Sequence, residues 1–344
     1  MVWLMKKRLE YIDASRGLAI FTVVYSHICL FCLPGYESSA VLEFLRSYFL
    51  NAFFFISGFV AFKQAFHPCK YYLDQLLNKV GLLLIPTVTV GVVYAISHNI
   101  PIILLLFDPA KYGYWFTFVL FEMFAIYYVV SIAFRLINKL RAVSMLMLLL
   151  AVGLYYAKKC GLYNVDISNL FCLDNLSYYF VYYSLGLFAK EYKALVTSVL
   201  YKWGGIVVAM IFIIVALSYV VPIPFFVKNM SILVIVLYVL RACCKQKETP
   251  EFMIPIKMIL LTLGQYTLEI YFIHYFLLFN LPDALGEYLK ELSASAKSLS
   301  FPEIIIVGCI VIAICYTCIV VAYFIKQIPF LSSLVFGKKI ISNA

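Results

Sequence analysis

Apolar stretches of about 20 residues follow one another along nearly the whole chain, and they constrain its fold more than any other feature. A helix of that length crosses the hydrocarbon core of a bilayer, which is about 30 Å thick. The composition agrees, because 65% of the residues are hydrophobic and only 13% are charged, whereas soluble domains are about half apolar and a quarter charged. The sequence therefore predicts an all-α, polytopic integral membrane protein.

The apolar stretches predict about ten transmembrane helices. We expect them near residues 12–32, 42–62, 77–97, 114–136, 142–159, 170–189, 202–221, 224–243, 256–280 and 303–325. The short run 100–107, between Pro101 and Pro109, is expected to be re-entrant or interfacial. Because neither a long polar segment nor an internal repeat interrupts the pattern, residues 1–344 are predicted to form one transmembrane domain without an appended soluble domain.

The net charge of +10 is spread over small groups between the apolar runs. Basic residues gather in alternate loops, so the positive-inside rule predicts that both termini are cytoplasmic, in an inner or plasma membrane. Topology explains these charges better than a nucleic-acid partner, and none is expected. The basic run Lys6, Lys7 and Arg8 resembles the start of a signal peptide, but Arg16 and His27 interrupt the apolar core behind it, so we expect this segment to remain as the first span.

Ten cysteines lie mostly inside the apolar runs. The pairs Cys29/Cys32 and Cys315/Cys318 have the CxxC spacing, but neither has a matching second pair near it in sequence. We interpret the cysteines as small apolar residues and expect no metal site.

Three ionisable residues lie on one face of the first predicted span: Asp13, Arg16 and His27. At 100° per residue, His27 lies about 20° from Arg16 around the helix and about 16 Å further along its axis. Asp13 and Arg16 are either an interfacial ion pair with a snorkelling arginine or part of a site. His27 is either a buried structural group or a proton carrier, and we favour the proton carrier.

Thr267, Tyr271 and His274 follow one face of the ninth predicted span, with the spacing i, i+4, i+7. His274 is expected at about the same depth as His27, so the two histidines could form a polar centre near the outer side. Glu269 lies on another face and is expected to make a structural hydrogen bond. Glu122, in the fourth span, is expected to orient a histidine, to bind substrate or to be structural.

The segment RLEYIDASRGLAIFTVVYSH, residues 8–27, resembles the first-helix signature of the membrane-bound acyltransferase 3 family, in which an Arg and a His separated by ten residues follow an Asp. Three further blocks resemble family motifs in the right order: NAFFFISGFVAF (51–62), YWFTFVLFE (114–122) and LGQYTLEIYFIH (263–274). The resemblance extends from about residue 8 to 326.

The resemblance implies transfer of an acyl group, most often acetyl, from cytoplasmic acyl-CoA to a sugar hydroxyl at the outer face. His27, with Asp13 and Arg16 of the same motif, would be catalytic, and a covalent acyl-histidine route is an alternative. Arg16 and Lys79 would hold the phosphates of acetyl-CoA or another acyl-CoA. Trp115, Glu122, Tyr271 and His274 are the candidates for binding the acceptor, a cell-envelope glycan or lipid-linked sugar. Stabilisation of the oxyanion is an alternative role for Trp115, Tyr271 or His274.

One position departs from the family pattern. Family members commonly carry two basic residues three apart before a proline, and here Lys79 and Pro86 are present but Leu82 stands at the second basic position. Two other functions compete with the acyltransferase: a transporter or flippase for polysaccharide or lipid-linked intermediates, and an accessory subunit of a polysaccharide-synthesis complex.

Overall fold

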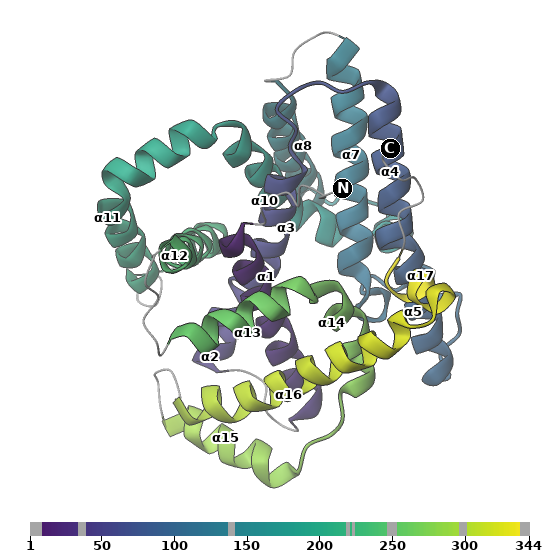
Figure 1. Ribbon diagram of the computed structural model, residues 1–344, viewed down its shortest axis with the longest axis vertical. Coiled ribbons are helices and arrows are strands. Elements are labelled where there is room, and N and C mark those ends of the chain that lie inside the picture. The colour runs from purple at the N-terminus through teal and green to yellow at the C-terminus, as the bar shows by residue number, and fades with distance from the viewer. Residues whose placement is uncertain are drawn as a thin grey trace, which may run out of the picture. The chain divides into compact units, whose positions relative to one another are not determined.

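The computed structural model describes residues 9–33, 39–136, 142–217, 221, 224–245, 253–295 and 301–337 (Figure 1). The terminal basic residues that support the predicted orientation, Lys6, Lys7, Arg8, Lys338 and Lys339, lie outside these ranges. Across the described residues every regular element is a helix and there is no strand, so the all-α prediction is confirmed. The chain divides into two compact units, residues 1–53 with 197–322 and residues 54–196 with 323–344, each described by itself below.

The first unit holds both predicted histidines. Its helices include α1 (Glu10–His27), α2 (Ala40–Arg46), α12 (Phe225–Lys245), α13 (Ile254–Gln265), α14 (Thr267–Ile273), α15 (Asp283–Ser295) and most of α16 (Phe301–Lys326). A π-helical segment, Ile28–Cys32, continues α1. Helix α1 is regular as far as His27, so the positions of Arg16 and His27 deduced from a 100° turn per residue apply to it.

The central contact of the first unit joins α1 to α13, which lie side by side in Figure 1. Gly17 lies against the backbone of Leu260, and Gly264 lies against the backbone of Asp13. A Cβ atom at either glycine would overlap a carbonyl group of the other helix. The absence of a side chain at both positions therefore lets the two helices meet backbone to backbone.

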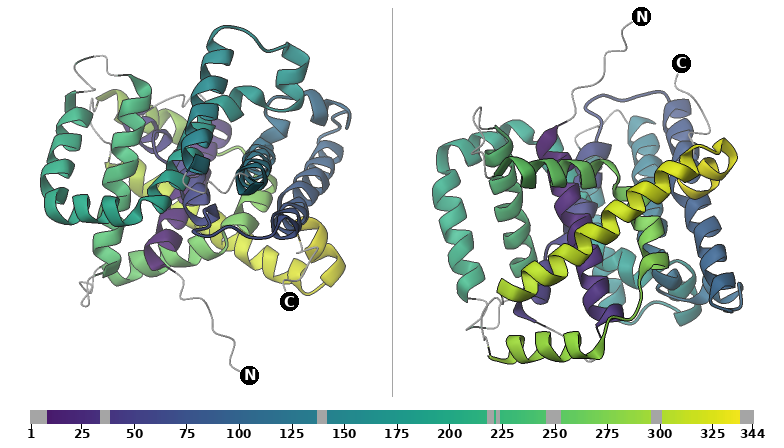
Figure 2. Two further views of the ribbon diagram at one scale, coloured as in Figure 1. Left: turned by 90° about the horizontal axis from the view of Figure 1, so that it is seen from above. Right: turned by 60° about the horizontal axis from the view of Figure 1, so that its bottom comes forward.

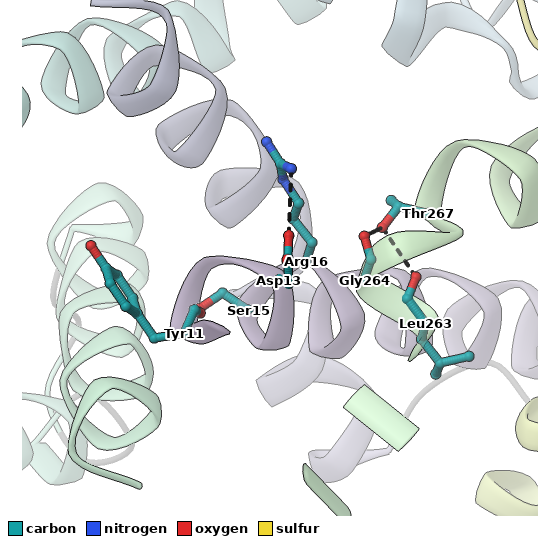
Figure 3. Close-up of polar contacts among 7 residues, drawn as sticks. All are labelled: Tyr11, Asp13, Ser15, Arg16, Leu263, Gly264 and Thr267. Atoms are coloured by element: carbon teal, nitrogen blue, oxygen red, sulfur yellow. Dashed lines mark hydrogen bonds and ion pairs between the residues drawn. The ribbon is translucent and has the colours of Figure 1, made fainter. Parts of the chain in front are cut away.

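The ninth predicted span, 256–280, is not one straight helix. Helices α13 and α14 meet at Tyr266 with a bend of 70°, and a 3₁₀ turn, His274–Leu277, follows α14. The Thr267 hydroxyl donates to the carbonyl oxygens of Leu263 (3.2 Å) and Gly264 (2.9 Å), as Figure 3 shows. Because those carbonyls belong to the last turn of α13, where helical partners are missing, Thr267 stabilises the bend.

The second unit consists of the middle of the chain and the last helix. Its helices are α4 (Cys69–Lys79), α5 (Ile85–Ser97), α6 (Leu104–Phe107), α7 (Trp115–Leu136), α8 (Ala142–Lys159), α9 (Val165–Leu170), α10 (Leu173–Glu191) and α17 (Pro329–Val335). Helix α3 (Phe49–Ala61) and helix α11 (Lys193–Leu217) each cross the boundary between the units in sequence. Figure 2 gives two further views of all these helices. The predicted short piece at 100–107 contains only the four-residue helix α6.

Six helical segments of the described chain are long and apolar enough to cross a membrane, or seven if the bent pair α13–α14 counts as one span. They are 10–32, 41–61, 69–97, 115–135, 226–244 and 301–326. They coincide with seven of the ten predicted spans when the bent pair is included. The other three predicted spans are also helical, as α8, α10 and α11, so a count of ten stays a prediction.

Candidate functional site

Asp13, Arg16 and His27 form a polar stripe on α1, with Asp13 and Arg16 at its N-terminal end. The Arg16 guanidinium lies 3.9 Å from the Asp13 carboxylate, and Figure 3 shows the two side chains pointing toward each other. Asp13 is buried, whereas a third of the Arg16 side chain is exposed. This pair is at the limit of ion-pair distance, so the Asp13 carboxylate holds the Arg16 guanidinium on this face of α1.

The structure joins His27 and His274, as the depth argument from the sequence predicts. The Nδ1 atom of His27 lies 2.8 Å from the Nε2 atom of His274. The two imidazole rings are nearly parallel, with 5° between their planes. His274 is completely buried and His27 is half-buried. Such a distance and orientation fit an in-plane hydrogen bond between the rings.

The partners of His274 determine which ring nitrogen carries each proton. Its Nδ1 atom lies 3.0 Å from the Ile270 carbonyl oxygen and 2.9 Å from that of Tyr271. Carbonyl oxygens only accept, so Nδ1 must donate, and Nε2 of the neutral ring is then an acceptor. His27 consequently donates from Nδ1 to His274, which leaves the lone pair of His27 on Nε2. In this arrangement His274 fixes the tautomer of His27.

Tyr275 completes the surroundings of His27 and was not predicted from the sequence. Its hydroxyl oxygen lies 3.3 Å from Nε2 of His27, and its ring centroid is 4.8 Å from that of His27. The predicted face of Thr267, Tyr271 and His274 assumed a regular helix, whereas His274 and Tyr275 lie in a 3₁₀ turn. Tyr271 itself is buried, with its ring centroid 6.3 Å from that of His274.

A buried carboxyl group in the first unit was also missed by the sequence analysis. Glu303, in the first turn of α16, is completely buried. Its Oε1 atom accepts hydrogen bonds from the hydroxyls of Tyr25 (2.9 Å) and Ser39 (2.8 Å). Within the described part of the chain, its Oε2 atom has no partner. The signal available in the sequence was only an acidic residue at the first position of an apolar span.

In the second unit, Lys79 lies at the end of α4, directly before a π-helical segment, Val80–Leu84. Its Nζ atom lies 3.9 Å from the centroid of the Phe124 ring. Leu82, the residue at the departure from the family pattern, lies in the π-helical segment, where Gly337 packs against its backbone. Because His27 also directly precedes a π-helical segment, both motif residues stand at the kind of distortion that is frequent at functional sites.

Trp115 and Glu122 share one face of α7, since seven residues make nearly two helical turns. The Trp115 ring stacks on Tyr179, with centroids 5.5 Å apart, and Tyr179 also stacks on Phe54 at 5.0 Å. Glu122 is half-buried, and its Oε2 atom is buried without a partner among the described residues. An aromatic stack near a carboxylate is a combination that suits a sugar ring and its hydroxyls.

A buried ammonium group, on Lys111, lies in the loop before α7. Its Nζ atom donates to the carbonyl oxygens of Leu106 and Asn169, the second at 2.8 Å. Burial lowers the pKa of Lys111 below its ordinary value. Lys111 and Tyr112 both have left-handed backbone conformations, with φ of 47° and 51°. Strained non-glycine residues of this kind concentrate at functional sites.

The sequence was also compared with known proteins. A family model described as an acyltransferase domain matches residues 9–321. The chain belongs to the acyltransferase 3 family. Neither a curated protein nor a solved structure matches the chain. Membership of this family, together with the apolar helices, identifies a multi-pass membrane acyltransferase.

Proposed function

We propose that this acyltransferase 3 protein moves an acyl group from cytoplasmic acyl-CoA to a hydroxyl group of a sugar, with acetyl as the first candidate for the acyl group. The sugar belongs to a cell-envelope glycan, an exported glycan or a lipid-linked intermediate. The proposal includes its location in the inner or plasma membrane. The observation that carries it is the hydrogen-bonded pair of His27 and His274.

In this reaction His27 is the general base. Its Nε2 lone pair takes the proton of the acceptor hydroxyl as the oxygen attacks the thioester carbonyl. His274 is a positioning residue, because it accepts the Nδ1 proton of His27 and is itself fixed by two carbonyl oxygens. The leaving thiolate of CoA then recovers the proton from His27. The Tyr275 hydroxyl must move away from Nε2 of His27 before the acceptor hydroxyl can reach that nitrogen.

Arg16 of the first unit and Lys79 of the second are each proposed to contact a phosphate of the donor. A third of the Arg16 side chain is exposed, and its planar guanidinium matches the geometry of a phosphate. Asp13 orients the guanidinium rather than reacting. The Lys79 ammonium is directed by the face of Phe124.

Trp115, Glu122 and Tyr271 are proposed to bind the acceptor. The Trp115 ring, stacked with Tyr179, offers a flat face to a sugar. Glu122 has a buried oxygen without a partner in the described chain, which a sugar hydroxyl would satisfy. Tyr271 supplies the carbonyl oxygen that orients His274.

The acyl ester content of surface glycan tests this function in a host strain that lacks the protein. The strain is complemented with wild type, His27→Ala, His274→Phe or, as the matched control, His98→Ala, which removes an exposed histidine in the second unit. We expect wild type and the control to restore the ester, and both site variants to lose it by about 100-fold or more. Unchanged ester content in the deletion strain would refute the proposal. Loss of the whole glycan from the surface would instead indicate a transporter or flippase.

A further inference from the structure

Arg46 lies next to the histidine pair, although neither the motifs nor the predicted stripe includes it. It is the last residue of α2, which packs against α1 within the first unit. Its Nε atom donates to the Ser26 hydroxyl over 3.5 Å. Ser26 is buried and directly precedes His27, so this contact places the guanidinium at the level of His27 along α1.

The guanidinium of Arg46 has no carboxylate partner within ion-pair distance among the described residues. Glu43, the acidic residue on the same helix, is exposed, and the buried Glu303 binds Tyr25 and Ser39 instead. Its contact with Ser26 holds the positive charge of Arg46 close to His27, the next residue of α1. A half-buried cation with no anion beside it in the described chain is costly in a membrane unless a negative charge forms there during function.

Acyl transfer creates such a charge. When the acceptor oxygen attacks the thioester, the C–O bond forms, the carbonyl electron pair moves onto oxygen, and the hydroxyl proton passes to Nε2 of His27. When the intermediate collapses, the carbonyl re-forms, the C–S bond breaks, and the CoA thiolate takes the proton from His27. Between these steps the oxyanion lies a few ångströms from the base, where a fixed guanidinium is most effective.

We infer that Arg46 is a further catalytic residue, which stabilises the oxyanion of the tetrahedral intermediate formed next to His27. Ser26 is the positioning residue that holds Nε and leaves the two terminal nitrogens of Arg46 for the oxyanion. The inference rests on the proposed acyl transfer, but the chemistry of His27 can test it without the natural acceptor.

Two reagents separate oxyanion stabilisation from a structural effect on His27. Diethyl pyrocarbonate acylates a histidine through a tetrahedral oxyanion, whereas iodoacetamide alkylates it by direct displacement without one. The full-length protein in lipid nanodiscs is treated with each reagent at about pH 8, well above the ordinary histidine pKa of about 6.5. Peptide mass spectrometry then gives the rate at His27, with His67 and His98 as references in the same sample.

The variants are Arg46→Gln, Arg46→Lys and Ser26→Ala, with Arg135→Gln in the second unit as the matched loss of an arginine charge. We expect Arg46→Gln to slow acylation of His27 about tenfold or more, with a smaller effect in Arg46→Lys and Ser26→Ala. The rate of alkylation at His27 should stay at its wild-type value. The rates of acylation and alkylation at His67 and His98 should also be unchanged, and this agreement shows that the variants fold. Equal acylation rates in wild type and Arg46→Gln would overturn the inference. Parallel loss of acylation and alkylation would do so too, because Arg46 would then only position His27.

A second arm measures acetyl-CoA consumption with a glycan extract of the host membranes. We expect kcat to fall roughly 100-fold in Arg46→Gln, with KM for the extract unchanged. A rise in KM with kcat unchanged would mean that Arg46 binds an anionic group of the acceptor and would overturn the oxyanion role. If wild type consumes no acetyl-CoA, the proposed function fails, and the reagent rates still decide the role of Arg46.

Discussion

Gly264 of α13 lies directly against the carbonyl group of Asp13 of α1, so the two helix backbones touch at the N-terminal end of the polar stripe. The opposing contact, Gly17 against Leu260, repeats this relationship one turn along α1. Backbone atoms rather than side chains fill the space between the two helices. A larger residue at either glycine therefore cannot be accommodated by a change of side-chain rotamer. The separation of α1 from the helix that leads to His274 is thereby fixed by the absence of two side chains.

Gly264→Ala is expected to destabilise the protein by about 1–3 kcal/mol, because the added Cβ must push α1 and α13 apart. It should also reduce acyl transfer, since that displacement separates His27 from His274. Thermal unfolding in detergent and the transfer assay measure the two effects. The control is Gly153→Ala in α8, where the Cβ meets nothing within 4 Å and should stabilise the helix by about 0.5–1 kcal/mol. Equal stability of the two variants would contradict the prediction.

Replacement of Glu303 should show that its carboxyl group organises Tyr25 and Ser39. Glu303→Leu leaves two buried hydroxyls without their acceptor, at a cost of about 1–3 kcal/mol for each. Glu303→Gln keeps the accepting oxygen and should be milder. Melting temperature in detergent checks this order, with Glu287→Leu on the exposed side of α15 as the control. The prediction fails if Glu303→Leu melts no lower than Glu287→Leu.

Lys79→Ala should raise KM for acetyl-CoA by about 10–100-fold, the effect of losing one charge-assisted phosphate contact. Phe124→Leu should raise the same KM only a few-fold, because it removes the ring that directs the Lys79 ammonium over 3.9 Å. Lys190→Ala is the control, since Lys190 also lies over an aromatic ring, that of Phe59, but outside the proposed donor contact. An unchanged KM in Lys79→Ala would remove Lys79 from the donor site.

Gly337→Ala should loosen the docking of the last helix, α17. Gly337 has φ of 76°, and a Cβ there would collide with the backbone of Gly81 and Leu82. Gly161→Ala is the matched control, because Gly161 has a similar φ of 66° but no neighbour within 4 Å. Faster hydrogen exchange of residues 329–337 is expected in the first variant only. Equal exchange in both would mean that backbone strain, about 1–2 kcal/mol, is the whole effect.

Helical periodicity predicted that His27 and His274 lie at about the same depth, because α1 is regular, and the structure shows the two side chains in contact. The bend itself was not predictable, since it depends on the Thr267 hydroxyl reaching two carbonyls of the preceding turn. Tyr275 was missed because its position depends on the 3₁₀ turn, which helical periodicity does not predict. Glu303 and Arg46 were missed because their partners, Tyr25, Ser39 and Ser26, lie far away in sequence.

The contact of Tyr275 with His27 bears on hydrolysis of the acyl donor in the absence of an acceptor. In the structure the tyrosine hydroxyl faces the only nitrogen of the pair that is open to a substrate. In the proposed reaction, a water molecule at the same nitrogen would be activated as readily as a sugar hydroxyl. It would then hydrolyse the acyl-CoA thioester. A sugar that binds elsewhere in the protein can displace the tyrosine with its binding energy, whereas a lone water cannot. If the protein carries out the proposed transfer, the contact of Tyr275 with His27 would protect the acyl-CoA thioester from hydrolysis until the acceptor binds.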